Sequence, residues 1–467
     1  MKLFQQMLVA GTAMSLIAPT VIQASDKINL DEIESYSSSK KFDHKTFIKQ
    51  VNKEVVSQDQ PELLKSVYEA GTFSDTTTLD GKAIFAVGGI ENSSGDISEA
   101  TMFQYTYQMN LNTSFSGDDN LYVRLKSGNG VGPFSSKADG SYLSSTNTNG
   151  DVLKIDKIWY EFPLGDNHTF WVGPKIENYY MHGATPSIYS PTLKQFKLGG
   201  NGAAYGASTD KGAGWAYRAD NGFSISSNVV SKAGVTAGDN QYTATTTATI
   251  DITAAQIAAL VDGDGNAVAG VADIAPDTAT LTTTVVDADP AASTTRGLLS
   301  DEAKTNWSTQ VAYTTDRYHL SALVAMKYND WEDSYFSTTA GKARTDGSTN
   351  YGLRGYWRPE DSGTAVPEIS VGYDISTVEN QDADTNAYFV GLTWKDMFQA
   401  SDKVGLAFGS PQSTENEAED PFTWEAYYSF KPNDSMEVRP TLFGYTSARG
   451  TADRDYTGVV LETTFKF

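Results

Sequence analysis

The sequence lacks cysteine altogether and holds only 4 histidines in 467 residues. A chain without cysteine has no disulfide scaffold, no thiolate metal site and no cysteine nucleophile. Long apolar runs are also missing: no stretch of roughly 18 apolar residues follows the first two dozen positions, which excludes a polytopic helical membrane protein. Basic residues are few, 35 against 58 acidic ones, and the net charge of -23 argues against a protein that binds nucleic acid through its phosphates.

Signatures of catalysis are equally sparse. The four histidines include no pair at the helical spacing of metal ligands, and the chain has no G-x-S-x-G motif and no glycine-rich phosphate loop followed by Lys and Ser or Thr. His319 and Ser321 are two residues apart and would share one face of a strand, so a hydrolase is one hypothesis, with coincidence as the preferred interpretation. We therefore predict no enzymatic activity and no cofactor.

Aromatic residues, in contrast, are abundant. The 25 Tyr, 21 Phe and 8 Trp supply enough apolar surface to order the chain, which separates it from disordered acidic proteins. Together with 40 Gly and many Thr and Ser, this composition is typical of a large β-protein.

The N-terminus predicts the compartment. Lys2, the apolar run 7–18 and the small residues Ala24 and Ser25 are typical of a secretory signal peptide, with cleavage expected after Ala24. Apolar residues then recur at helical spacing on both sides of Pro61. We predict a signal peptide over 1–24 and a short helical periplasmic segment and linker over 25–79. For this segment a spacer or an oligomer contact is preferred to a binding role.

From about residue 80 to residue 467 the pattern alternates with a period of two. In 103–115 the odd positions are mostly aromatic or apolar and the even positions are polar, which is the pattern of a strand with one greasy and one wet face. Aromatic residues gather towards the strand ends, as in the girdles of membrane barrels. Sixteen strands are predicted, at 82–90, 101–115, 119–127, 151–163, 168–175, 203–219, 222–232, 305–316, 317–329, 348–359, 366–377, 386–396, 402–409, 422–431, 435–447 and 456–467. The segment 203–219 is the least regular and could form two short strands around Asp210 to Gly212.

The connectors and the last residue indicate which kind of barrel this is. Short turns rich in Gly, Asn, Asp and Pro alternate with long connections at 128–150, 176–202, 233–304 and 330–347. Bacterial outer-membrane barrels have an even number of strands, short periplasmic turns and long external loops. The chain ends on Phe467, with Phe465 on the same face, like the terminal strand that the barrel-assembly machinery recognises. We predict an all-β transmembrane antiparallel barrel over 80–467, in the lipid of the cell outer membrane.

A barrel of about sixteen strands encloses a water-filled channel, which predicts passive diffusion of small hydrophilic solutes. Selectivity is expected at the narrowest point, and we predict that the third external loop, 176–202, folds inwards there. Alternation also places acids on the lumen face, namely Glu368, Asp374, Glu425 and Glu437, so the ion preference is left open. The candidate pore residues are Tyr179, Tyr180, His182, Lys194 and Lys197 on the loop, and Arg124, Lys126, Arg354, Arg358 and Arg439 on the strands, with Lys327, Tyr189 and Phe196 as further members.

Three stretches carry a family resemblance. FSDTTTLDGKAIFAVGG at Phe73 to Gly89, LGGNGAAYGAS at Leu198 to Ser208, and the leader MKLFQQMLVA are similar to cyanobacterial outer-membrane porins of the carbohydrate-selective porin family. The resemblance implies a porin, a homotrimer, that passes sugars or inorganic ions. Many such porins carry an S-layer-homology domain and a coiled coil that tether them to the cell wall. Residues 26–70 are too short for that domain, so cell-wall anchoring is not carried over.

The long insert 233–304 offers an alternative. It is rich in Ala, Thr and Asp, with a helical pattern at 254–260. Asp262, Asp264 and Asn266 resemble the first half of a calcium loop, but residue 267 is Ala where a sharp turn needs Gly, and the twelfth position holds Asp273, not Glu. An acidic surface loop is the preferred interpretation. The second functional hypothesis is a surface-binding or adhesin barrel that acts through this insert and has a closed lumen.

Overall fold

The computed structural model describes residues 76–93, 95, 98–136, 140–200, 202, 205, 209–232, 243–251, 278–286, 298, 303–328, 347–360, 366–378, 384–414 and 417–467. The predicted signal peptide and helical segment, up to residue 75, lie outside the described residues. So do the helical pattern at 254–260 and the calcium candidates Asp262, Asp264 and Asn266. Within the described part of the chain, no helix has the length and apolar composition needed to cross a bilayer.

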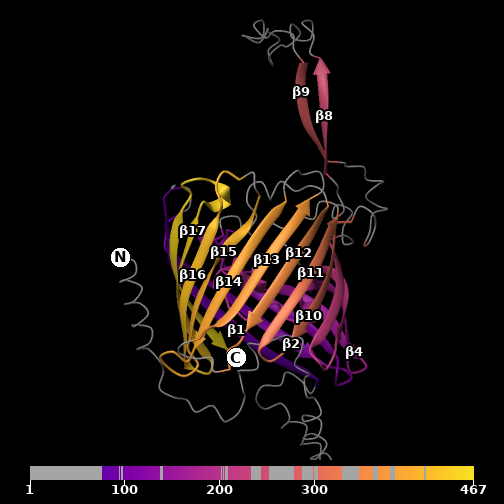
Figure 1. Cartoon of the computed structure of the whole chain (residues 1–467), viewed down its shortest axis with the longest axis vertical. Helices are drawn as coiled ribbons and strands as arrows, with labels where there is room; N and C mark the ends of the chain where they lie inside the picture. Colours follow the sequence, from indigo (N-terminus) through magenta and orange to yellow (C-terminus); the bar gives the residue numbers. More distant parts are fainter. Residues whose placement is uncertain are drawn as a thin grey trace, which may run out of the picture. The chain divides into compact units, whose positions relative to one another are not determined.

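Sixteen antiparallel strands form one closed barrel, as the alternation predicts (Figure 1). Each strand pairs with its neighbours in sequence order, with β7 next to β10, and β1 closes the ring on β18. They are β1 (Thr77–Asn92), β2 (Met102–Thr113), β3 (Asn120–Gly128), β4 (Lys154–Leu164), β5 (His168–Glu177), β6 (Thr209–Arg218), β7 (Phe223–Ser231), β10 (Thr305–Thr314), β11 (Tyr318–Tyr328), β12 (Ser348–Trp357), β13 (Glu368–Val378), β14 (Thr385–Lys395), β15 (Lys403–Thr414), β16 (Phe422–Asn433), β17 (Met436–Thr446) and β18 (Tyr456–Lys466).

Several strand boundaries differ from the prediction by a few residues, and two strands are instructive. β1 begins at Thr77 and not at 82, because its first residues pair with β2 alone, before the register with β18 starts at Lys82. Within the predicted segment 203–219, the structure describes one strand, β6, from Thr209 to Arg218, which pairs with β5 and β7 on its two sides.

The seam of the barrel is closed by the last residue. The Gly81 amide donates to the Phe467 carbonyl at 2.8 Å, and the Phe467 amide donates back to the Gly81 carbonyl at 3.1 Å. The Phe467 ring stacks on Tyr107 of β2 with centroids 5.8 Å apart. Closure leaves no unpaired edge strand, which is the condition for a sheet to sit in lipid.

The barrel is apolar outside and polar inside. On β10, the side chains of Trp307 and Tyr313 are 49% and 50% exposed, whereas Asn306, Ser308 and Gln310, which alternate with them, are fully buried. The same inversion repeats around the barrel, where large apolar side chains face outwards and polar ones face the lumen. A water-soluble sandwich has the opposite arrangement, so this barrel fits a surround of hydrocarbon.

One turn at the end of the barrel that holds Phe467 is organised by a carboxylate. Between β2 and β3, Asp119 accepts hydrogen bonds from the backbone amides of Phe115 and Ser116, at 2.9 and 2.7 Å, and from the Tyr160 hydroxyl at 2.7 Å. Burial alone would raise the pKa of Asp119, but these hydrogen bonds outweigh it and hold the pKa well below its usual range.

The turn between β14 and β15 repeats the device. Asp402 accepts from the backbone amides of Met397, Phe398 and Gln399 at 2.7 to 3.0 Å, and from the Tyr428 hydroxyl at 3.0 Å. Burial alone would raise the pKa of Asp402, and these bonds lower it. In both turns the tyrosine belongs to a row of outward-facing rings that forms an aromatic girdle, namely Phe115, Tyr160, Phe162 and Phe170, and Phe398, Tyr428 and Phe430.

The chain between β7 and β10 forms a separate compact unit, residues 232–304. It contains a two-stranded antiparallel sheet of β8 (Thr243–Asp251) and β9 (Thr278–Val286), paired from Thr243 with Val286 to Asp251 with Thr278. The sequence analysis missed these strands because they are built largely from Thr and Ala. Threonine favours strands, but the segments lack the large apolar face on which a period of two is recognised.

Candidate pore constriction

The connection after β5 folds into the lumen. We call residues 178–200 the inward loop; it contains two 3-10 turns, Asn178–Met181 and Lys194–Gly199. Its backbone amides donate to polar side chains on the lumen face of distant strands. The Ala184 amide reaches Gln310 of β10 at 3.0 Å, and the Ile188 amide reaches Ser370 of β13 at 3.3 Å.

A buried glutamate on β16 holds the middle of the inward loop. Glu425, fully buried, accepts from the backbone amides of Leu193 at 2.7 Å and Thr192 at 3.2 Å, and from the Tyr189 hydroxyl at 2.9 Å. Alternation predicts this glutamate on the lumen face. Three of the about four hydrogen bonds that a carboxylate can accept come from the loop. Glu425 therefore holds the loop in place and is not a free charge on the lumen wall.

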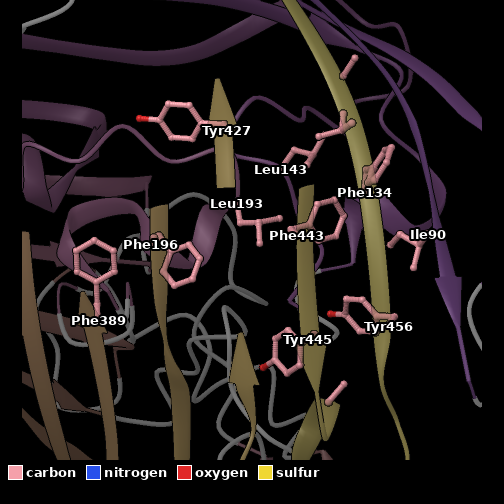
Figure 2. Close-up of a cluster of buried hydrophobic side chains, with 14 of the residues drawn as sticks. Ile90, Phe134, Leu143, Leu193, Phe196, Phe389, Tyr427, Phe443, Tyr445 and Tyr456 are labelled. Carbon is pink, nitrogen blue, oxygen red and sulfur yellow. The ribbon is translucent and has the colours of Figure 1, made fainter. Parts of the chain in front are cut away.

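Apolar packing supports the same contact. Figure 2 shows Leu193 and Phe196 of the inward loop beside Phe389 of β14 and Phe443 of β17, all buried in one cluster. The rings of Phe196 and Phe389 lie 5.6 Å apart. A hydrophobic patch inside a polar lumen exists only where a loop covers it, so these residues mark where the loop lies.

A second connection, between β3 and β4, braces the first. Leu143, fully buried, forms a β-bridge with Leu193, and the Lys194 amide donates to the Tyr142 carbonyl at 2.9 Å. Phe134 of the same connection packs edge-on against Phe443 of β17. The sequence analysis gave this connection no role, although its buried Phe and Leu were the signal that could have identified it.

The end of the inward loop sits on β12 and β13. Arg354, fully buried, pairs with Asp374 at 2.9 Å and donates through Nε to the Leu198 carbonyl at 2.9 Å. Gly199 has φ +75°, and its carbonyl oxygen lies so close to Gly372 that no Cβ fits there. Glycine is therefore required on both sides of this contact, at Gly199 in the loop and at Gly372 in β13.

The start of the inward loop lies against a basic wall formed by β3 and β4. Arg124 donates through Nε to Asp156 at 2.6 Å and lies 3.9 Å from Glu177, and Lys157 pairs with Glu177 at 2.9 Å. Lys197 of the loop lies 6.0 Å from the ring centroid of Tyr179. Lys126 and Lys194 both interact electrostatically with Lys197.

A row of aromatic contacts accompanies this wall. The centroids of Tyr179 and Tyr180 are 4.9 Å apart, those of Tyr180 and Trp159 are 5.1 Å apart, and those of Trp159 and Tyr122 are 4.3 Å apart. Such contacts stabilise the loop start in a fixed position.

The predicted pore residues thus divide into groups. Tyr179, Tyr180, Lys194, Lys197, Arg124 and Lys126 come together at the basic wall. Arg354 and Arg439 lie on the β12 to β17 side, where Arg439 pairs with Glu437 at 2.8 Å and donates to the Ser190 carbonyl at 3.2 Å. Arg358 lies at the turn end of β12, 3.7 Å from Glu368.

Two further candidates are buried. His182 is 2% exposed, with its ring edge-on to Tyr205, and Lys327 is 3% exposed. His319 Nε2 does lie 2.9 Å from Ser321 Oγ, but its Nδ1 faces the Thr314 hydroxyl at 2.7 Å. A triad needs a carboxylate at that position, so the pair lacks the third member.

Three charged residues of the basic wall were missed from the sequence. Strict alternation puts Asp156 and Lys157 on opposite faces, yet both meet lumen charges. The ladder between β3 and β4 shifts register at Arg124 and Leu125, which leaves Asp156 without a cross-strand partner. This irregularity lets neighbouring residues face inwards. Glu177, the last residue of β5, was included in the loop without a role. Among the described residues, no group of three or more His, Asp or Glu side chains could hold a metal ion.

Comparisons with known proteins agree with this fold. No protein-family model matches the sequence. An uncharacterized protein of Nostoc is 25% identical over 418 residues, which cover 85% of this chain and 67% of that protein. An uncharacterized protein of Synechocystis is 28% identical over 155 residues, 31% of this chain and 27% of that protein.

Among solved structures, OprB of Pseudomonas putida aligns with a TM-score of 0.54 at 10% identity, over 87% of this chain and 96% of that chain. A variant of the Rh. blastica porin aligns with a TM-score of 0.47 at 9% identity, over 84% and 100%. The shared fold is inferred from OprB alone. The chain therefore has the closed sixteen-strand barrel fold of bacterial outer-membrane porins.

Proposed function

We propose that this protein is an outer-membrane channel through which small hydrophilic solutes, sugars and inorganic ions, diffuse passively. The observation that carries the proposal is the inverted barrel, with apolar side chains outside, polar ones inside and a loop folded across the lumen. Hydrocarbon outside and water inside are the conditions that this arrangement satisfies.

The inward loop is the proposed constriction, with Tyr179, Tyr180, Lys194 and Lys197 at its narrowest side. These four side chains are half-buried. In this proposal the solute passes between the loop and the wall, and the loop is held by Glu425 and Arg354. A homotrimer and delivery by the barrel-assembly machinery through Phe467 are further parts of the proposal.

The decisive measurement is the conductance of the purified full chain in a planar bilayer. We expect stable steps, in triplets if the trimer is correct. A folded sample that gives no conductance would refute the channel and favour the surface-binding alternative, for which the separate unit of residues 232–304 is the specific observation.

A matched variant separates the two hypotheses further. Ser231 and Thr305 are cross-strand partners, so a short turn can replace residues 233–303 without changing the ladder. The channel hypothesis predicts unchanged step size in this variant. A surface-binding protein would lose its binding activity instead.

A further inference from the structure

The basic wall holds more positive charge than the acids near it can balance. Six basic residues form what we call the basic cluster: Lys82, Arg124, Lys126, Lys157, Lys194 and Lys197. Asp156 and Glu177 pair with members of this cluster, and two more acids, Asp80 and Glu462, act on Lys82. Six positive and four negative charges leave a formal +2, inside a chain whose net charge is -23.

Four members of the cluster can meet a passing solute. Lys82, Lys126, Lys194 and Lys197 are half-buried, whereas Arg124 and Lys157 are 9% and 4% exposed. Lys82 and Lys126 lie in one row of the sheet, because Lys82 pairs with Gln108 and Gln108 pairs with Lys126. Lys194 and Lys197 lie on one 3-10 turn of the inward loop. The charge of Lys197 acts on the other three lysines, so the four contribute to one local potential. Since these side chains face the lumen, the medium that exposes them is the water of the pore.

The opposite wall offers no such excess. Counting along the ring in either direction, β13 is eight strands from β3. There Arg354 is matched by Asp374 at 2.9 Å. On β17, four strands from β3, Arg439 is matched by Glu437 at 2.8 Å. Among these described charges, the positive excess therefore lies at the basic cluster, beside the inward loop.

We propose that the basic cluster makes this channel selective for small inorganic anions, such as chloride, nitrate and phosphate, despite the acidity of the whole chain. This inference rests on the proposed channel function. Charges at a constriction set ion preference because the low-dielectric wall focuses their potential on the path, while charges on distant loops are screened over about 10 Å at 0.1 M salt. The negative net charge of the whole chain would suggest a preference for cations, which is the opposite of the preference proposed here.

The test is the reversal potential of the full chain in a potassium chloride gradient. The wild type is expected to reverse on the chloride side of zero. Lys194→Gln together with Lys197→Gln should lower the ratio of chloride to potassium permeability by about threefold or more. A matched control, Arg317→Gln together with Lys403→Gln, removes two positive charges from the turn end of the barrel and should leave the ratio unchanged.

The failures of the two proposals are distinguishable. Absence of conductance refutes the channel itself. A conducting wild type that prefers potassium refutes anion selection by the basic cluster and leaves the channel proposal intact. A conducting double variant with unchanged reversal potential does the same. A second measurement separates charge from pore width: the preference should weaken as potassium chloride rises from about 0.1 to about 1 M, because the Debye length falls from about 10 to about 3 Å. A preference independent of salt would contradict the charge mechanism.

Discussion

The two walls of the lumen treat charge differently. On the β12 to β17 side, each arginine meets a carboxylate, and Arg354 and Asp374 are almost fully withdrawn from water, with side chains 0% and 2% exposed. In the basic cluster, basic residues outnumber acids, and four of the five lysines are half-buried. A buried charge needs a partner, whereas a charge in contact with pore water does not.

The difference separates two roles within one lumen. The paired wall fixes the inward loop, because Arg354 and Glu425 direct their hydrogen bonds at loop backbone. In the proposed channel, the basic cluster keeps its charge available to solutes. Substitutions should accordingly change stability on the first wall and permeation on the second.

The largest effect is expected from breaking the buried pair. Asp374→Asn leaves Arg354 buried without a counter-charge, which costs about 3–5 kcal/mol. Asp156→Asn, on the basic wall, removes a carboxylate that is 22% exposed and should cost about 1 kcal/mol or less. Urea unfolding in detergent compares the two variants. Equal losses of stability would contradict the distinction between the walls, and Arg354→Met with Asp374→Leu should recover much of the loss.

A second prediction concerns the contact between Gly199 of the inward loop and Gly372 of β13. Gly372→Ala places a methyl group against the Gly199 carbonyl, which should displace the loop end, cost about 1–3 kcal/mol and increase single-channel conductance. Gly355→Ala on the neighbouring strand is the control, because its Cβ meets the His319 carbonyl oxygen at 3.4 Å, an ordinary contact. Unchanged conductance in Gly372→Ala would mean that the loop end does not limit the pore.

The smallest effect should be equal on both sides. Asp119 and Asp402 organise turns below the basic and the paired wall, and both have a lowered pKa. A lowered pKa means that the stabilisation is present above the unfolded-state pKa, about 3.9, and is lost as the pH falls towards the folded-state value. Asp119→Asn and Asp402→Asn should each cost about 1 kcal/mol at pH 7 and progressively less below about pH 4. Acid unfolding curves test this, and a large difference between the variants would mean that the walls already differ at their turns.

The barrel could be predicted from sequence because its rule is local. Alternation over a dozen residues, such as 103–115, shows which face meets lipid, and each turn is marked by Gly, Asn or Asp. The inward fold of the third connection was inferred by analogy with other porins. Its anchors could not be found, because Glu425 and Leu193 are 232 residues apart in sequence and no local pattern links them. Asp156 and Lys157 were lost to a register shift that alternation cannot detect.

The contacts of the inward loop also constrain the order in which the chain can be built. Tyr189 bonds to Glu425, 236 residues later, and Ala184 bonds to Gln310, 126 residues later. Contacts between such distant positions form late, because the intervening chain must first be ordered. The inward loop can therefore reach its final position only when the distant strands that it contacts, from β10 to β17, are present in the sheet. The third connection, although it comes early in the chain, is thus fixed only after strands near the C-terminus, whose last residue, Phe467, joins the two ends of the barrel at Gly81.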